Sequence, residues 1–577
     1  MKRAVRNPWL FWGWFLISSL VYCWILLGPY GDHFENLVPR LLILAGMVAI
    51  SLVFLKSKWN EFEFWIALLV SLIGYAVVYK IAGFLPSINA YPFTLTWSEG
   101  TAYYFASLFF SEKIYGIKVN LPIINPTRHM LMAIPFLVSD LPIWVHRLWE
   151  VILWFVISGL ALALLVRRLG IRDNLVRWTF SAWVILYLFQ GPVYYFLLLS
   201  LFPVLWGFDA KNFRKTLLLV LIGSVWAGAS RVNWIPVPAL LAATLYFLEE
   251  KVGDDPWPRY LLKPGIWLAL GTIVALIAWY GYTAWSGNLV GDFGIYFTSN
   301  LLWYRLLPNA TFKEGVLLVA LLASIPLLGI ITIHLYSSGF KYHLIRRLGI
   351  GAIMFVLFLG GLIVSTKIGG GNNIHNLDAY LLILLVTGSY IYFDKTDPDY
   401  NLQEKDAPQR LITLFVSLAV LIPILFTLQD GKPAFRHNPT RTENARLTIQ
   451  EYATDAVTDG GKVLLIAERQ LLTFGDIEGI PLIPEYERMN LMEMVMGGNH
   501  AYLDEFHQRI ENQEFALIIS EPLKTKYKGR SEAFGEENDV YVRLVSKPVL
   551  CYYEPVKTIS ILSIQLLIPK PESENCS

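Results

Sequence analysis

Charged side chains are scarce in this sequence. Lys, Arg, Asp and Glu make up 16% of its 577 residues, whereas a soluble globular protein carries about a quarter. The net charge is only +2, and the basic residues lie between apolar segments. Because a nucleic-acid-binding surface needs clustered cations, this distribution excludes one, and no nucleic acid is expected as a partner.

Cysteines are few, and internal repeats and nucleotide-binding motifs are missing. Cys23, Cys551 and Cys576 are widely spaced and odd in number, so they predict neither a disulfide framework nor a zinc site. The sequence has no repeat with a clear period, which argues against a transporter built from matching halves. The three glycines that begin at Gly369 follow no predicted strand and lead into no Gly-Lys-Ser/Thr. They therefore do not form a nucleotide phosphate-binding loop.

Long apolar runs occupy most of the chain before residue 429. Hydrophobic residues make up 55% of the sequence, and the mean hydropathy is +0.49. A helical run of about 18 to 22 residues crosses a hydrocarbon layer of about 30 Å. The runs predict an α-helical polytopic membrane protein with about thirteen transmembrane helices. These lie near residues 1–28, 39–55, 63–84, 143–166, 175–190, 192–207, 214–230, 234–249, 264–285, 315–335, 348–366, 378–394 and 411–428.

Every second loop between these helices is rich in lysine and arginine. With a cytoplasmic N-terminus, every cytoplasmic loop is basic, as residues 167–177 and 341–347 illustrate, while the opposite loops are poor in cations. Cytoplasmic loops of membrane proteins show this enrichment. An odd number of helices then places the C-terminus outside. The sequence predicts a multi-pass protein of the plasma (inner) membrane with an extracytoplasmic C-terminal domain.

The composition becomes that of a soluble domain after Asp430. Residues 461–475 and 515–520 predict buried strands, residues 499–513 an amphipathic helix, and residues 540–555 a β-hairpin. This is an α/β pattern, long enough for its own core. We expect two additional N-terminal helices in 1–62, a membrane domain in 63–428, and an extracytoplasmic α/β domain in 429–577.

Glu99 is the first candidate for chemistry. It lies in the stretch TLTWSEGTAYYFASLFFSEKIYG, residues 94–116, where Tyr103 and its aromatic neighbours follow one helical turn later. Two interpretations stay open: Ser98 or Glu99 caps the helix that follows, or the aromatic side chains form a water-poor wall that suits the carboxylate to proton abstraction. Further along the same loop, Arg128 and His129 precede a short apolar helix that is expected to lie along the membrane interface.

A second polar cluster lies at the junction of two apolar helices. The stretch STKIGGGNNIHNLD supplies backbone N–H groups and a lysine that could hold an anion such as phosphate, although a simple turn capped by Asn376 or Asp378 is the alternative. Arg231 and Arg305 are single cations at outer helix ends, which could reach lipid headgroups or a ligand phosphate. Arg147 and Glu150 are expected to form an ion pair within one helix. The polar residues of the second cluster are Lys367, Asn372, Asn373, His375, Asn376 and Asp378.

These features together resemble a known group of membrane enzymes. WSEGTAYYFASLFFSEKIYG, a loop with prolines, a short apolar helix, WVHRLWEVILWFVISGLALALLVRRLG and the later Lys/Gly/Asn junction are similar to the GT-C superfamily of polytopic membrane glycosyltransferases. The likeness is to the bacterial branch similar to protein mannosyltransferases and lipid A aminoarabinose transferases, over residues 63–394. Two departures stand out: Ser98 stands where that family often has a second acid, and NPTRH replaces its paired prolines.

The resemblance implies a GT-C-like fold and a specific reaction. A sugar would move, with inversion, from a polyprenyl-phosphate donor to an acceptor hydroxyl of a glycan, lipid or protein at the outer membrane face. Glu99 would be the catalytic base, and Lys367, with Arg231 and Arg305, would hold the donor phosphate. The predicted substrate-binding residues are Tyr103, Arg128, His129, Asn372, Asn373, His375, Asn376 and Asp378.

No cofactor is implied beyond the lipid-linked donor, and no metal ligands are assigned, although a divalent cation stays open. Membrane lipids are expected partners. Three other functions remain alternatives: a polysaccharide ligase or polymerase, a transporter of lipid-linked sugars, and a non-enzymatic scaffold in which the Glu99 loop is only a cap.

Overall fold

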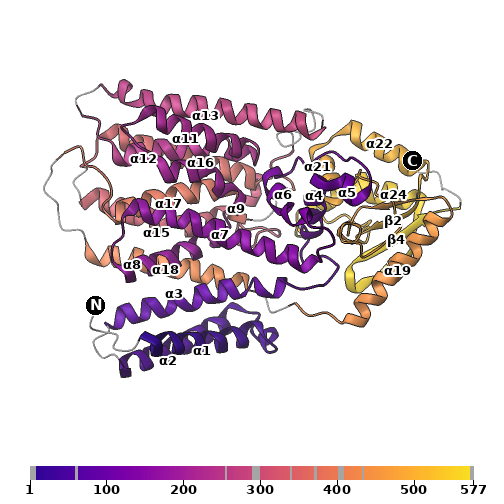
Figure 1. The fold of residues 1–577 in the computed structure, drawn as a ribbon, viewed down its shortest axis with the longest axis horizontal. Helices are drawn as coiled ribbons and strands as arrows, with labels where there is room; N and C mark the ends of the chain where they lie inside the picture. Colours follow the sequence, from indigo (N-terminus) through magenta and orange to yellow (C-terminus); the bar gives the residue numbers. More distant parts are fainter. Residues whose placement is uncertain are drawn as a thin grey trace.

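The computed structural model describes residues 8–58, 63–253, 256–288, 299–337, 341–369, 373–400, 408–431 and 435–571. Its helices up to residue 431 lie side by side along the long axis, and the α/β domain covers one end of them (Figure 1). The described chain begins near the other end. The predicted fold class, an α-helical polytopic bundle followed by a C-terminal α/β domain, is confirmed.

The bundle contains fewer full-length spans than the sequence predicts. Within the described residues, nine helices are long and apolar enough to cross a membrane, and a tenth span results if α8 (Asn174–Gln190) is joined to the Tyr195–Gly207 segment across a 118° bend. The predicted count of about thirteen is not confirmed. Two of the predicted spans are the two legs of this bend, and α11 (Phe213–Gly228) has only 16 residues. The first predicted span, α1 (Pro8–Leu27), enters among the described residues only as a shorter apolar helix, Trp12–Leu27. The helices of the nine spans are α2 (Leu37–Lys58), α3 (Phe64–Ala82), α7 (Ile143–Leu169), α12 (Val237–Glu249), α13 (Trp257–Ser286), α15 (Val316–Ser337), α16 (Leu344–Ser365), α17 (Asp378–Tyr392) and α18 (Gln409–Asp430). The spans of α12 and α17 include the short helical turns before them and cover Val232–Glu249 and Ile374–Tyr392.

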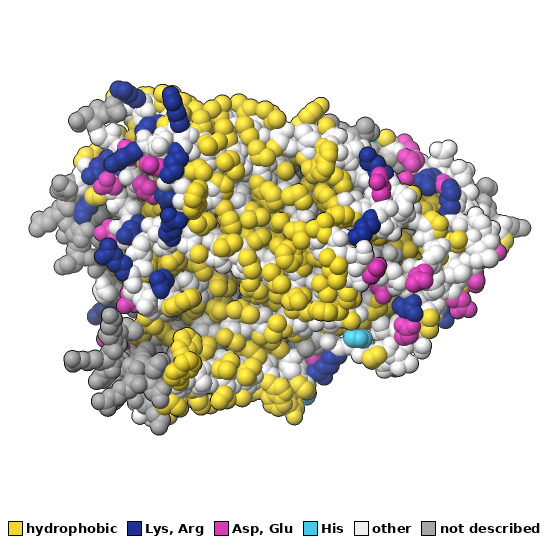
Figure 2. Space-filling model, viewed as in Figure 1, with side chains coloured by type: hydrophobic (Ala, Val, Ile, Leu, Met, Phe, Trp, Pro, Cys, Tyr) yellow, Lys and Arg dark blue, Asp and Glu magenta, His cyan; other side chains and the backbone are white. Residues whose placement is uncertain are grey.

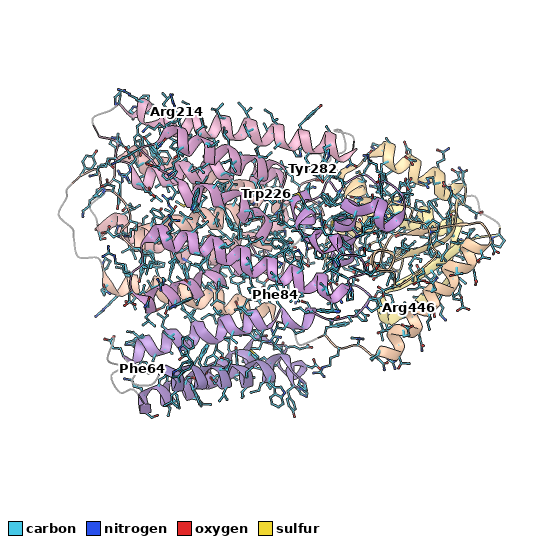
Figure 3. The ribbon with its side chains drawn as sticks, viewed as in Figure 1. Phe64, Phe84, Arg214, Trp226, Tyr282 and Arg446 are labelled. Carbon is cyan, nitrogen blue, oxygen red and sulfur yellow. The ribbon has the colours of Figure 1, made fainter. Side chains whose placement is uncertain are left out.

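The two ends of the bundle differ in charge. Figure 2 shows a broad apolar belt, with Lys and Arg gathered at the end far from the α/β domain. Figure 3 places Phe64 and Arg214 toward that basic end, and Phe84 and Tyr282 toward the α/β domain. Helix α3 therefore runs away from the basic end. The belt is what lipid-facing surfaces require, because exposed charge is costly within the hydrocarbon layer.

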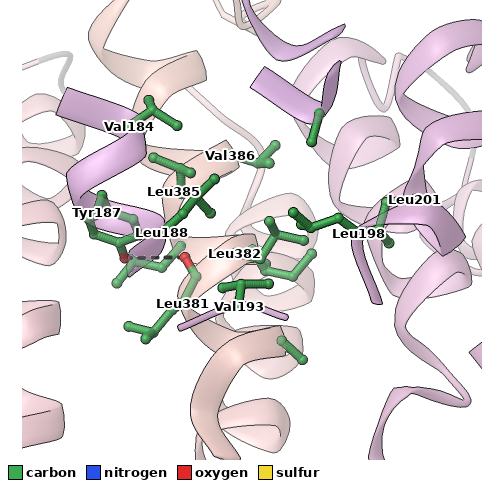
Figure 4. Packing of buried hydrophobic residues seen from close by; sticks show 14 of the residues in the cluster. Val184, Tyr187, Leu188, Val193, Leu198, Leu201, Leu381, Leu382, Leu385 and Val386 are labelled. Atoms are coloured by element: carbon green, nitrogen blue, oxygen red, sulfur yellow. Dashed lines mark hydrogen bonds between the residues drawn. The ribbon is translucent and has the colours of Figure 1, made fainter. Parts of the chain in front are cut away.

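Helix α17 forms the centre of the bundle. All but one of its residues are buried, so it is apolar on every side, as expected of a core helix. Leu381, Leu382 and Leu385 of α17 belong to the same buried cluster as Val184 and Leu188 of α8 (Figure 4). The Tyr187 hydroxyl donates a hydrogen bond of 3.2 Å to the Leu381 carbonyl.

The C-terminal domain contains one four-stranded sheet of order β1-β2-β4-β3. Strands β1 (Lys462–Leu465) and β2 (Phe515–Ser520) are parallel, while β4 (Ile564–Pro569) pairs antiparallel with both β2 and β3 (Tyr553–Ile559). Its main helices are α19 (Pro439–Thr458), α21 (Arg488–Gly497) and α22 (His500–Glu511).

Two expectations for this domain are wrong. The predicted hairpin at 540–555 is helical as far as Tyr552, because Val542, Val545 and Val549 recur at helical spacing on one buried face. Cys551 is disulfide-bonded, although the sequence predicted no disulfide. The odd number of cysteines concealed this bond, since Cys23 in α1 (Pro8–Leu27) is free. The other cysteine after the membrane helices, Cys576, lies outside the described residues.

Candidate active site

Glu99 begins α4 (Glu99–Ser107) and forms an ion pair with Arg147 near the start of α7. Arg147 Nε donates to Glu99 Oε1 at 2.9 Å, and Nη2 donates to Oε2 at 3.2 Å. The Arg147 side chain is only 1% exposed, and it also bonds the carbonyls of Asn89, Tyr91 and Phe93. One arginine thus holds both the carboxylate and the loop that leads to it.

The Glu99 carboxylate has room for one more hydrogen bond. Besides the two bonds from Arg147, Oε2 accepts the Leu95 amide at 2.6 Å. A carboxylate offers about four acceptor positions, so one remains on Oε1 among the contacts of the described residues. The side chain is 12% exposed, and Ser98 makes no capping hydrogen bond. The carboxylate therefore folds back onto its own loop, with one lone pair for a donor group.

Tyr103, one helical turn after Glu99, is the aromatic residue whose surroundings include this carboxylate. Tyr103 is 1% exposed, and its hydroxyl has no hydrogen-bond partner among the described residues. Burial, and after it the charges of Glu150 and Glu99, raise the pKa of Tyr103 well above its ordinary value. Its hydroxyl therefore stays protonated and can donate a hydrogen bond to a ligand.

Arg128 lies on α6 (Pro126–Met132) and pairs with Glu150 of α7 at 3.0 Å. The expected ion pair between Arg147 and Glu150 is therefore replaced by two ion pairs between helices. Nε of Arg128 has no hydrogen-bond partner among the described residues, and the side chain is 18% exposed. Part of this guanidinium remains available to a ligand.

Arg231 lies just before the short helix η6 (Val232–Trp234). The hydroxyls of Thr127 and Ser230, which precede Arg128 and Arg231, hydrogen-bond at 2.6 Å. Arg231 Nη2 donates to Asn376 Oδ1 at 2.7 Å. Two predicted site arginines, from loops far apart in the sequence, therefore meet at this point.

The Asn376 and Asp378 side chains support Arg231. Asp378, fully buried, lies 3.6 Å from Arg231 Nη1 and accepts the Trp234 indole N–H at 2.9 Å. Neither Asn376 nor Asp378 is the N-cap residue of α17, which is Leu377. The two polar side chains thus hold the arginine, and this fits a binding site better than the simple capped turn.

The two histidines have different surroundings. His375, in η9 (Asn373–Leu377), packs its ring 5.9 Å from that of Tyr194, at the start of α9 (Tyr195–Leu198). His129 is buried against Phe105, with ring centroids 5.2 Å apart. Burial and the Arg128 charge lower the pKa of His129 well below its ordinary value, so this histidine stays neutral. Asn372 lies outside the described residues, and so does the side chain of Asn373.

Lys367 and Arg305 contact carboxylates of the C-terminal domain. Lys367 Nζ is 3.3 Å from Glu493 of α21. Arg305 donates two hydrogen bonds of 2.6 Å to Glu537, and Glu536 lies 3.5 Å away. Carboxylates of the domain thus balance both predicted phosphate contacts.

Lys367 and the Glu99 loop nevertheless lie on the same side of the protein. Arg488 of α21 bonds the Trp97 carbonyl and lies over the Trp97 ring. Glu493, the partner of Lys367, is five residues further along α21, which corresponds to about 7.5 Å of helix. One short helix therefore contacts both regions.

Sequence reasoning missed several residues of the cluster: Arg147, Glu150, Tyr194, Tyr195, Ser230 and Trp234. Arg147 and Glu150 did carry a signal, since ionisable residues near the end of a membrane helix usually form ion pairs or take part in function. The others are aromatic or small side chains that resemble ordinary core residues.

Two further features do not add to the cluster. Within the described residues, no group of three or more His, Cys, Asp or Glu side chains could hold a metal ion. An apolar cavity of about 270 Å³, lined by residues such as Leu69, Phe180 and Val416, lies among α3, α8, α17 and α18. Its α3 and α8 residues are close to the basic end, so it is separate from the site around Glu99.

Comparison with known proteins gave limited results. No family pattern matches the chain, and no curated protein does. Among solved structures, ArnT from Cupriavidus metallidurans in the apo state has 12% identity and a TM-score of 0.42, covering 88% of this chain and 99% of that one. The same protein bound to undecaprenyl phosphate has 14% identity and a TM-score of 0.43, covering 88% and 98%. A likeness of this size assigns no activity to the chain.

Proposed function

We propose that this protein is a glycosyltransferase that moves a sugar from a polyprenyl-phosphate donor to an acceptor hydroxyl. One observation carries the proposal: an acid with a remaining acceptor position and two arginines gather at one end of an apolar bundle. Tyr103 links them, because it lies within electrostatic reach of Glu99, Glu150 and Arg128. A lipid-linked sugar phosphate needs a base, cations and apolar walls together.

Glu99 is the base in this mechanism. Its remaining lone pair on Oε1 accepts the hydrogen bond of the acceptor hydroxyl and takes the proton as the hydroxyl oxygen bonds to the anomeric carbon. Arg147 fixes both carboxylate oxygens, so the direction of that lone pair is set before substrate binds. Attack from the face opposite the phosphate inverts the anomeric configuration.

The departing phosphate is held by Arg128 and Arg231. Both guanidiniums are partly exposed, at 18% and 21% of their side chains, and each donates to a neighbouring side chain on one edge. Their other N–H groups can bond phosphate oxygens as negative charge develops on the bridging oxygen. His375 and Tyr194 border Asn376 and Arg128, where they would contact the sugar. In this proposal Lys367 and Arg305 join the C-terminal domain to the bundle.

The reaction is proposed to occur at the outer face of the plasma (inner) membrane. Basic residues gather at the end of the bundle far from Glu99, as in cytoplasmic loops (Figure 2). The disulfide at Cys551 supports the same orientation, since disulfides persist in oxidising compartments outside the cytoplasm.

Purified protein in lipid nanodiscs tests the proposal. A polyprenyl-phosphate sugar with a labelled sugar is the donor, and a bacterial envelope extract supplies acceptors. Wild-type protein should transfer label, and Glu99→Gln should lower the rate by about 10²–10⁴-fold while the protein still binds undecaprenyl phosphate. An unchanged rate in Glu99→Gln would exclude this acid as the base. Movement of the labelled lipid across vesicles without transfer would identify a transporter instead.

A further inference from the structure

The C-terminal domain extends a short segment, Glu468–Phe474, into the Glu99 region. This segment follows β1 and contains α20 (Gln470–Thr473). Glu468 has a φ of 58°, a left-handed conformation that is uncommon for residues other than glycine. Strained conformations of this kind persist where the surroundings enforce them. The surroundings here are the membrane domain.

Glu468 is a buried carboxylate bonded to the Glu99 loop. It is 6% exposed, and it accepts the Thr94 amide at 3.1 Å and the Thr94 hydroxyl at 2.8 Å. The Gln470 amide donates to the same carboxylate at 2.6 Å. Burial raises the pKa of Glu468 above its ordinary value. Burying a carboxylate is unfavourable unless its hydrogen bonds offset the lost solvation, so the bonds to Thr94 are central to this contact.

The loop bonds Glu468 and Glu99 through neighbouring amides. The Thr94 N–H donates to Glu468, and the next N–H, that of Leu95, donates to Glu99. Two carboxylates, one from each domain, therefore hold two consecutive peptide units, and a shift at Thr94 is passed directly to Glu99.

Close packing accompanies these hydrogen bonds. A Cβ atom at Gly100 would lie 2.3 Å from Gln470 Oε1, so the segment approaches the α4 backbone as near as a glycine permits. The Phe474 ring packs 5.7 Å from Tyr103 and 4.9 Å from His146. The segment thus contacts both the loop and the aromatic wall of the site.

We propose that Glu468 is a positioning residue for Glu99, and that the C-terminal domain forms one wall of the active site. This inference rests on the proposed function of Glu99. Glu468 does not touch substrate. It holds Thr94 through the N–H of the Phe93–Thr94 peptide and through the side-chain hydroxyl. The amide of the next residue, Leu95, in turn fixes the direction of the Glu99 carboxylate.

The test compares Glu468→Gln and Thr94→Val with wild-type protein in the nanodisc assay. Glutamine has one acceptor oxygen fewer and valine lacks the hydroxyl, so each variant removes part of the same contact. We expect kcat to fall by about 10–100-fold, the range caused by small misplacements of catalytic groups. KM for the donor should be unchanged, because Arg128 and Arg231 are intact. The double variant should lose little more than either single variant, because the two act through one contact.

Hydrogen exchange supplies a readout apart from activity. In Glu468→Gln, amides of residues 92–100 should exchange faster, while the sheet of the C-terminal domain should exchange as in wild type. Glu554→Gln, at an exposed position of β3, is the matched control and should change neither exchange nor kcat.

The outcomes separate the two proposals. Loss of transfer in Glu99→Gln with normal kcat in both Glu468→Gln and Thr94→Val would overturn the positioning role and leave the glycosyltransferase intact. Full activity in all three variants would overturn the function itself. If Glu468→Gln does not fold, Thr94→Val alone decides, because it removes one hydrogen bond of a half-buried loop residue and leaves the buried carboxylate in place.

Discussion

The hydroxyl oxygens of Thr127 and Ser230 lie 2.6 Å apart. This hydrogen bond joins α6 to the end of α11, and the residues that follow are Arg128 and Arg231. The hydrogen bond brings together the chain segments that carry two cations 103 residues apart in the sequence. Each has a carboxylate that balances part of its charge, Glu150 for Arg128 and Asp378 for Arg231. The pair is available for a dianionic group such as a phosphate monoester.

Replacing these arginines should weaken the binding of lipid phosphate. Arg128→Ala and Arg231→Ala should each raise the Kd for undecaprenyl phosphate by about 10–100-fold, because hydrogen bonds to charged groups contribute about 1.5–3 kcal/mol. Native mass spectrometry or a fluorescence titration in detergent measures the change.

Lys367→Ala is the matched control for that measurement. Its ammonium contacts Glu493 at the domain interface, so its removal should affect Kd less than either arginine variant. A larger effect of Lys367→Ala would show that the sequence-based assignment is right and that the phosphate binds near α21.

Arg147→Met should destabilise the protein strongly. The substitution leaves Glu99 and three loop carbonyls without their donor in a buried place, and breaking a buried ion pair typically costs about 3–5 kcal/mol. The thermal midpoint in detergent should fall clearly. Arg446→Met provides the comparison, since Arg446 is a surface residue of the α/β domain (Figure 3) and pairs with Glu443 on the same helix. Surface pairs of this kind contribute about 0–1 kcal/mol. Equal shifts for both variants would contradict the role of Arg147.

Acid should remove the contribution of Glu514 to stability. Hydrogen bonds from Arg509 and then Lys462 lower the pKa of Glu514 to about 2. A carboxylate with a lowered pKa in the folded state stabilises the fold above its unfolded pKa, and this contribution disappears as the pH falls through the folded value. The difference in thermal midpoint between wild type and Glu514→Gln should therefore shrink between pH 4.5 and pH 2. A difference that stays constant over this range would show that the pairing does not stabilise the domain.

Thiol labelling should distinguish Cys551 from Cys23. In denatured, unreduced protein, Cys23 should react with a maleimide and Cys551 should react only after a reductant is added, because Cys551 is disulfide-bonded. Peptide mass spectrometry identifies the labelled residue. Labelling of Cys551 without reductant would remove one support for the outer location of the domain.

The helical bundle could be predicted because the length of an apolar run has only one structural interpretation in a membrane. A run of about 20 apolar residues can satisfy its backbone in a bilayer only as a helix, so runs such as 316–337 mark their spans directly. The pair at 174–207 could not be resolved in this way, since composition does not show whether two short helices continue or fold back. The apolar residues of 540–555 fit both the spacing of a strand and that of a helix. Packing of the three buried valines in this segment favours the helix.

The site was predictable in its residue types but not in its pairings. Glu99 and Arg231 were found because polar residues are costly beside lipid. Lys367 was assigned to the donor phosphate because it accompanies three glycines, and no neighbouring residue in the sequence indicated that Glu493 would pair with it. Glu468 carried no sequence signal, because its role depends on a contact with Thr94 that spans 374 residues.

The bend between α8 and the Tyr195–Gly207 segment places irregular backbone within the bundle. Neither leg crosses the hydrocarbon layer alone, so the chain turns inside the bundle, where irregular backbone is tolerated only if protein encloses it. Tyr194 and Tyr195 lie at this bend, within electrostatic reach of Arg128. The ring of Tyr194 packs against that of His375. In the proposed function, a lipid carrier that reaches the arginines would contact this bend instead of other lipids, and the depth of the bend in the bundle would limit how deeply its head group lies.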